Sequence, residues 1–126
     1  MSKLKVGIAS AQEMKARTLA IARGEVKASE DDPKVWFTST ESFAKVLSNK
    51  NRALLDFIAS AHPQSLKEIA EGTGRATSNL SRTLKTMADY GLVTLHEGPR
   101  GQVRPEVPYD EITLVVALFH QEPAAP

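Results

Sequence analysis

The fold of this 126-residue chain is decided by residues 65–104, SLKEIAEGTGRATSNLSRTLKTMADYGLVTLHEGPRGQVR. A short helix, a glycine-containing turn, a second helix and a glycine-tipped hairpin follow one another in this stretch. The second helix is apolar on one side and carries small polar and basic residues on the other. Such a helix can enter a DNA major groove while it stays anchored to a hydrophobic core.

The first helix of this stretch has a clear start and a clear end. Ser65 and Glu68 fit the S-x-x-E capping box, in which the two side chains satisfy backbone donors at a helix N-terminus. Gly72 and Gly74 flank Thr73, and glycine allows the backbone to turn sharply there. The second helix is expected from about Ala76 or Thr77 to Tyr90, with Gly91 as its left-handed C-terminal cap.

The second helix separates its apolar residues from its polar ones. Its buried stripe is predicted to consist of Leu80, Leu84 and Met87, at i, i+4 and i+7. At about 100° per residue, the opposite face holds Ser78, Arg82 and Lys85, with Asn79 and Ser81 on its shoulders. Thr77 lies in the first turn, where free backbone amides can meet a phosphate.

These exposed residue types suit double-stranded DNA. Arginine can bond a guanine edge and asparagine an adenine edge through two hydrogen bonds each. Serine and threonine can bond either bases or phosphates, and lysine suits a phosphate. An ordinary solvated helix face is the alternative, but the capped helix, the turn and the hairpin favour DNA contact. Base reading is expected of Arg82, Asn79 and Ser78, and positioning of the helix is expected of Ser81, Lys85, Arg75 and Thr77.

The hairpin is predicted from residues 92–97 and 102–107, which are candidate strands. Gly98, Pro99 and Gly101 supply the turn, with Arg100 at its tip. Arg100 and Arg104 are therefore expected to reach phosphate or the minor groove as a wing would. An ordinary surface hairpin is the alternative.

Residues 75–93, RATSNLSRTLKTMADYGLV, resemble the recognition segment of the MarR- and ArsR-like winged-helix transcription regulators of bacteria and archaea. The pattern S-x-L-S-R-x-L-K-x-L-x-x-x-G-L-V is matched from Ser78 to Val93, with Met87 in place of a leucine. The match covers roughly residues 51–107, and the whole chain is similar to a small prokaryotic MarR-like group with extra terminal strands. The resemblance implies a winged helix-turn-helix in an α+β, mainly α fold.

The resemblance also implies a function, but not every property of the MarR family is transferred to this chain. We expect a sequence-specific regulator that binds double-stranded DNA as a dimeric repressor. MarR proteins dimerise through long flanking helices, and this chain lacks the C-terminal one, so their dimer geometry and ligand pockets are not transferred. An antitoxin that neutralises a partner toxin and controls its own operon is the alternative, and a winged helix that binds only protein is a third.

The remainder of the chain is interpreted as support. We expect a strand at 3–9, a helix capped by Ser10 and Glu13 to about Gly24, an acidic connector at 29–33 and a strand at 35–38. Thr38 and Glu41 are expected to cap the next helix, and Asn49 or Asn51 to begin another that His62-Pro63 ends. The expected units are 1–48 for dimerisation, 49–108 for DNA binding, a C-terminal strand at 109–121 and a disordered tail at 122–126.

The terminal strands should form one sheet. Pairing within one chain would close the fold, and pairing between chains would make a two-fold dimer. The expectation is a homodimer with the N-terminal strand and helix at its interface.

Composition sets the broad class. The net charge is only +1, but residues 72–104 hold five basic and two acidic side chains, which gives +3, and residues 1–27 hold six and two, which gives +4. The chain has no cysteine, no secretory signal and no apolar run near the roughly 18 residues of a membrane span, so a cytoplasmic protein without membrane attachment is expected.

Other chemistry is not indicated by the sequence. His62, His96 and His120 have no metal-ligand spacing, and no nucleophile motif, phosphate loop or carboxylate pair is present, so no enzyme, metal or cofactor is expected. Trp36 and Phe37 could stack on single-stranded nucleic acid, but a strand that packs one aromatic ring inward is the favoured interpretation. Asp110 and Glu111 are expected at a solvated strand edge.

Overall fold

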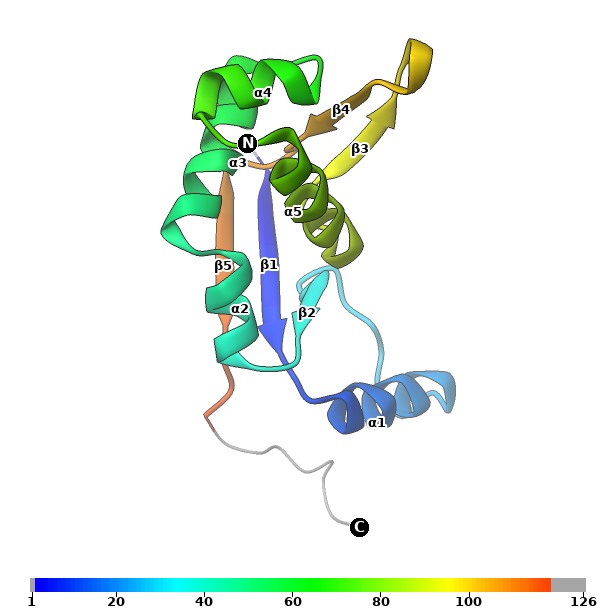
Figure 1. Ribbon diagram of the computed structural model, residues 1–126. Helices are drawn as coiled ribbons and strands as arrows, with labels where there is room; N and C mark the ends of the chain where they lie inside the picture. The colour runs from blue at the N-terminus through cyan, green and yellow to red at the C-terminus, as the bar shows by residue number, and fades with distance from the viewer. Residues whose placement is uncertain (1, 119–126) are drawn as a thin grey trace.

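The apolar segments near the two ends of the chain meet in one parallel sheet. The computed structural model describes residues 2–118 (Figure 1). In it, strands β1 (Lys3–Ile8), β2 (Val35–Phe37) and β5 (Glu111–Val115) pair in the order β2-β1-β5. Leu4 lies opposite Ile112, and Val6 lies between Val35 and Leu114, so these five residues share one face of the sheet.

Five α-helices and a hairpin complete this α+β fold in residues 2–118. The helices are α1 (Ala11–Ala22), α2 (Thr40–Val46), α3 (Asn49–Ala61), α4 (Leu66–Thr73) and α5 (Thr77–Tyr90). The hairpin pairs β3 (Thr94–Glu97) with β4 (Val103–Glu106) around a short turn at Pro99–Gly101. Among these residues, no helix combines the length and the apolar character needed to cross a membrane.

One hydrophobic core joins the sheet to the helices. Val6 and Phe37 from the sheet pack in the same cluster as Leu54, Ile69 and Leu84 from three helices, and each of the five is at most 1% exposed. The Phe37 ring stacks on Tyr90 at the end of α5, with a centroid distance of 4.3 Å. Helix α5 is therefore fixed directly against the sheet.

Phe37 and Trp36 point to opposite faces of the sheet. Phe37 faces the core, as predicted, whereas the Trp36 ring covers Gly7 so closely that a Cβ there would lie 2.5 Å from Cζ3. The guanidinium of Arg17 lies over the same ring, 5.6 Å from its centroid. The ring of Trp36 is thus occupied by contacts within the protein.

Helix α1 stands apart from the core and contains no buried residue (Figure 1). It begins with the predicted capping box of Ser10 and Glu13. Arg17 links it to the acidic connector, because its Nη2 atom lies 2.6 Å from Oδ2 of Asp32. The backbone N–H of Ser29, together with Arg17, holds the pKa of Asp32 below its ordinary value of 3.8.

The start of α2 differs from its prediction by one residue. Ser39, not Thr38, is the N-cap, and its hydroxyl accepts the N–H of Ser42 at 3.0 Å. Ser42, not Glu41, completes the capping box by accepting the N–H of Ser39. The segment T-S-T-E-S offers several hydroxyls in succession, and the extended backbone at Ser39 selects among them.

The neighbouring helix boundaries follow local signals. Ser48 caps α3. The first residue of this helix is Asn49, one of the two residues predicted to begin it. His62 ends α3 in the left-handed conformation with φ 48° before Pro63, as expected. The predicted disordered tail at 122–126 and the predicted strand residues 119–121, with His120 among them, lie outside the described residues.

The N-terminal strand lies at the centre of the sheet. Both edges of β1 are paired, one with β2 and the other with β5. The strands therefore pair within one chain, and β1 has no free edge to offer a second copy.

Candidate nucleic-acid interface

Helix α4 and the turn that follows it lead into α5. Ser65 caps α4 as predicted, and its Oγ accepts the N–H of Glu68 at 3.2 Å. The second half of the predicted box is shifted by one residue, because Oε2 of Glu68 accepts the N–H of Gln64 at 2.6 Å instead. Gly74 ends the helix with φ 75°, which is the left-handed turn expected of a glycine.

Gly72 has a packing role rather than the predicted role in the turn. It lies inside α4, and a Cβ at this position would lie 2.2 Å from Cζ of Phe57. The absence of a side chain therefore lets α3 and α4 approach closely.

Helix α5 has the predicted bounds. It runs from Thr77 to Tyr90. The N-cap residue, Ala76, makes no side-chain cap hydrogen bond, and Gly91 caps the C-terminus with φ 94°. The N–H of Leu92 closes the C-terminus by donating to the carbonyl oxygen of Met87 at 2.8 Å. The predicted stripe is buried in full, with Leu80, Leu84 and Met87 at 1% exposure or less.

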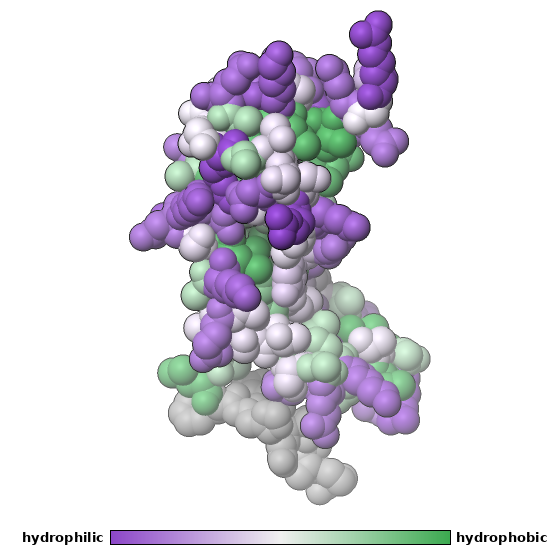
Figure 2. Space-filling model, viewed as in Figure 1, coloured by the Kyte–Doolittle hydropathy of each residue, from purple (hydrophilic) through white to green (hydrophobic). Residues whose placement is uncertain are grey.

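The opposite face of α5 is open to solvent. The residues of this helix that are predicted to touch DNA are all exposed: Thr77, Ser78, Asn79, Ser81, Arg82 and Lys85. Asp89 lies one turn beyond Lys85 and is also exposed, so the positive charge is confined to the first three turns. In Figure 2 purple, hydrophilic residues lie in the region of α5 and at the tip of the hairpin, with green, hydrophobic areas between them.

Arg75 is half-buried and bonded to three other side chains. Its Nε and Nη2 atoms both donate to Oδ1 of Asn79, at 2.9 and 2.7 Å. Nη1 donates to Oδ1 of Asn51 in α3 at 3.1 Å, and Nη2 reaches the hydroxyl of Thr83 at 3.3 Å. Arg75 therefore binds the protein itself, and it does so directly beside the exposed face of α5.

These partners of Arg75 were not predicted from the sequence. The spacing of Arg75 and Asn79, i and i+4, is a local signal that could have indicated their contact. Asn51 lies 24 residues away and no local signal links it to Arg75, because that contact depends on the packing of α3 against the turn.

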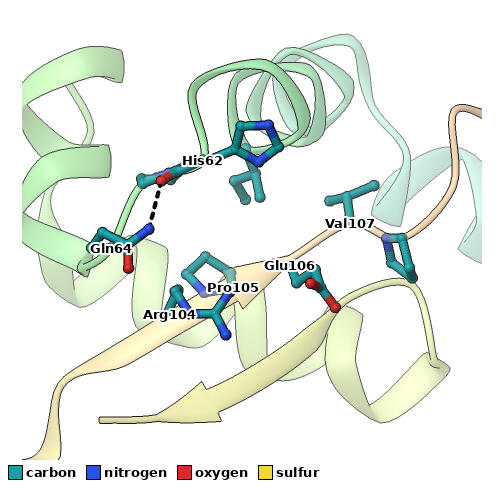
Figure 3. A pocket seen from close by; sticks show the side chains of 9 residues that line it. His62, Gln64, Arg104, Pro105, Glu106 and Val107 are labelled. Atoms are coloured by element: carbon teal, nitrogen blue, oxygen red, sulfur yellow. Dashed lines mark hydrogen bonds between the residues drawn. The ribbon is translucent and has the colours of Figure 1, made fainter. Parts of the chain in front are cut away.

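The hairpin separates its two arginines. Arg100 sits at the exposed tip with φ 61°, followed by Gly101, as predicted from the turn sequence. Arg104 lies within β4, opposite His96, and is half-buried. It lines a pocket of about 190 Å³ together with His62, the C-cap of α3, and Gln64 in the connection to α4 (Figure 3). The two arginines thus occupy different places, one at the exposed tip and one within the paired part of β4.

The histidines considered as metal ligands have other places in the structure. His96 pairs with Glu106 across the hairpin at 3.4 Å, and His62 ends α3. Within the part of the chain that the structure describes, no three His, Asp or Glu side chains gather where they could hold a metal ion.

Fold and site together define an α+β protein that presents a partly basic helix beside an arginine-tipped hairpin. The chain belongs to the HVO_A0114 family, whose model matches residues 46–114, the segment from the end of α2 to β5. Comparison with curated proteins and comparison with solved structures each found no match.

Proposed function

We propose that α4, α5 and the β3–β4 hairpin form a winged helix-turn-helix, and that the chain is a sequence-specific regulator of transcription that binds double-stranded DNA. The observation that carries the proposal is the division of α5 into two faces. Leu80, Leu84 and Met87 anchor it in the core, while Ser78, Arg82 and Lys85 are all exposed along the other face.

The exposed residues divide into base contacts and backbone contacts. Arg82 lies at the centre of the exposed face and is suited to a guanine edge, with Ser78 one turn nearer the N-terminus of α5. Lys85, Ser81 and Thr77 are suited to phosphates on either side of the groove. Arg100 at the hairpin tip is suited to the backbone or the minor groove beyond the major groove.

The regulator is proposed to act as a dimeric repressor. Occupation of a DNA site is sufficient to block another protein, so repression requires no further surface on this small chain. Two copies would supply two half-sites and twice the positive charge, which favours a dimer for a chain with a net charge of only +1.

A charge-reversal pair tests the assignment of the DNA-binding face. The variant Arg82→Glu/Lys85→Glu should weaken binding to duplex DNA by about tenfold or more, because both charges are proposed to lie against the DNA. The matched control Lys15→Glu/Arg23→Glu makes the same charge change at two exposed cations, one within α1 and one at its C-cap, and should bind nearly as the wild type does. Titration of labelled duplex by fluorescence anisotropy measures both, and equal losses in the two variants would contradict the assignment.

A further inference from the structure

The donors of Arg75 are almost all used within the protein. A guanidinium carries five N–H donors and no acceptor. Four hydrogen bonds are made to side chains: two to Asn79, one to Asn51 and one to Thr83. Little donor capacity remains for a phosphate, so Arg75 is poorly suited to the DNA contact predicted for it from the sequence.

Asn79 is held in one orientation by this contact. Because a guanidinium can only donate, the Asn79 atom that faces it must be the amide oxygen. That oxygen accepts two hydrogen bonds from Arg75, at 2.9 and 2.7 Å, and so both of its lone pairs are occupied. The Nδ2 group, with its two hydrogens, is left for a partner outside the chain.

The rest of the network keeps Arg75 in place. Asn51 accepts from Arg75 and in turn donates through its Nδ2 atom to the carbonyl oxygen of Val46 at 2.9 Å. Arg75 is therefore fixed to α3 as well as to α5, and the orientation of Asn79 is set before any partner binds.

We propose that Arg75 is a positioning residue that makes Asn79 a donor-only contact, so that α5 selects guanine and disfavours adenine at the base that Asn79 meets. This inference rests on the proposed function. Guanine presents two acceptors, N7 and O6, in the major groove, which match two N–H groups. Adenine presents an acceptor and a donor, and its usual pairing with asparagine needs the amide oxygen that Arg75 already occupies.

Selection of bound sequences from a randomised duplex library tests the inference. The wild type should enrich guanine at one position, and Asn79→Ala should make the four bases there nearly equal, a change of about fivefold or more in preference. Arg75→Met removes the donors but keeps the aliphatic length, so the freed amide oxygen should shift that same position toward adenine. Arg52→Met, at an exposed arginine of α3, is the control and should leave the profile unchanged.

Each contrary result has a distinct meaning. A wild-type preference for adenine at the position relaxed by Asn79→Ala would overturn the inference, as would an Arg75→Met variant that loses affinity for all sequences with an unchanged profile. If Arg75→Met fails to fold, Arg75→Lys, which keeps the positive charge but replaces the planar five-donor fork with one ammonium group, must instead show a weakened guanine preference at that position. A folded wild-type chain that binds no duplex at all would overturn the proposed function itself, and the inference with it.

Discussion

Arg82 lies on the middle of the exposed face of α5, with Ser78 one turn before it and Lys85 on the following turn. Its long side chain starts from a helix whose other face is anchored by Leu80 and Leu84, both at most 1% exposed. The backbone that carries this guanidinium is held rigidly, and its planar fork is shaped for two parallel hydrogen bonds, which favours a contact with a defined geometry. Among the residues of α5, Arg82 is therefore the one from which we expect most of the base discrimination.

Arg82→Ala should cost about 1–3 kcal/mol of binding free energy on the preferred site and should relax the preference at one base pair. Lys85→Ala serves as the comparison, because removal of a cation that meets a phosphate should weaken binding to all sequences alike. Anisotropy titrations on the preferred duplex and on a shuffled duplex measure both effects. Equal losses on the two duplexes for Arg82→Ala would assign Arg82 to the phosphate backbone instead.

Tyr109 ties the segment before β5 to the end of α5. Its hydroxyl donates to the carbonyl oxygen of Leu92, which follows the Gly91 cap. Burial raises the pKa of Tyr109 from 10.0 to about 12, because the ionised phenolate would be poorly solvated there. Folding therefore favours the neutral form of the Tyr109 side chain.

This raised pKa predicts a loss of stability at alkaline pH. The contribution of the neutral Tyr109 side chain to the free energy of unfolding is fully present below pH 10, the ordinary pKa of tyrosine. It is lost as the pH rises through about 12, the pKa of Tyr109 in the folded protein. Between these values the wild type should lose more free energy of unfolding than Tyr109→Phe, which has no ionisable group at this position. At neutral pH the substitution should cost about 1 kcal/mol, because it removes the hydrogen bond to Leu92. Urea denaturation at a series of pH values measures the free energy of unfolding of both proteins. Parallel pH profiles for the wild type and Tyr109→Phe would contradict this role of Tyr109.

At the scale of elements, the β3–β4 hairpin places its charges unevenly. Arg100 is exposed at the tip, whereas Arg104 is half-buried in β4 beside Gln64. The exposed side chain at the tip can reach a phosphate directly, whereas the half-buried side chain in β4 offers less of its surface to a ligand. We therefore expect Arg100 to contribute more than Arg104 to DNA binding.

Arg100→Ala should lower the slope of log affinity against log salt concentration by about one unit, since it removes one phosphate contact. Arg104→Ala should change this slope by less than Arg100→Ala does. Binding of one duplex measured over a range of salt concentrations checks both variants. The same slope in Arg100→Ala and the wild type would mean that the hairpin tip does not touch DNA.

How far each element could be predicted depends on how local its signals are. The bounds of α5 follow from its apolar spacing and from Gly91, all within one short stretch. The predicted cap of α2 is wrong by one residue because Thr38, Ser39 and Thr40 are chemically alike, and only the backbone conformation distinguishes them. The contact between Phe57 and Gly72 depends on how α3 packs on α4, which local patterns do not encode.

The candidate site was predictable in part for the same reason. The exposure of Arg82 and Lys85 follows from helical spacing alone, and the structure confirms it. The binding of Arg75 to Asn51 joins two elements distant in sequence, so the role of Arg75 could only be revised once their packing was known.

At the scale of the whole molecule, the sheet has two outer strands, β2 and β5. Strand β5 contains no lysine or proline that would block pairing, and its one charged residue, Glu111, is paired with Lys3 of β1 at 3.5 Å. Val115 and Val116 remain 44% and 42% exposed at its end. These features make β5, rather than the N-terminal strand, the edge at which we expect the proposed dimer to form.

A two-fold axis at Thr113 would pair all five residues of β5 with a second copy. Ile112 would then face Leu114 of the second copy, Glu111 would face Val115, and Thr113 would face itself, so no like charges oppose one another. On either side of this axis the apolar residues of both copies share one face of the extended sheet.

Substitution at Thr113 tests this dimer. Thr113→Lys and Thr113→Glu each place like charges opposite each other and should weaken dimerisation by about fivefold or more, whereas a mixture of the two variants should restore a heterodimer. Thr94→Lys, at an exposed threonine of β3, is the matched control and should remain dimeric. Sedimentation velocity at high micromolar concentration measures each state. A monomeric wild type, or a Thr113→Lys variant that dimerises as the control does, would contradict the proposed interface.

Selection of bound fragments from the genomic DNA of the source organism shows whether α5 reads double-stranded DNA. The wild type should retain a small set of fragments that share one motif, and it should bind that motif about 10³-fold or more tightly than a shuffled duplex at physiological salt. The variant Arg82→Glu/Lys85→Glu should retain none of them. A folded wild-type protein that retains no fragment at low salt, or that binds motif and shuffled duplex equally, would contradict the account.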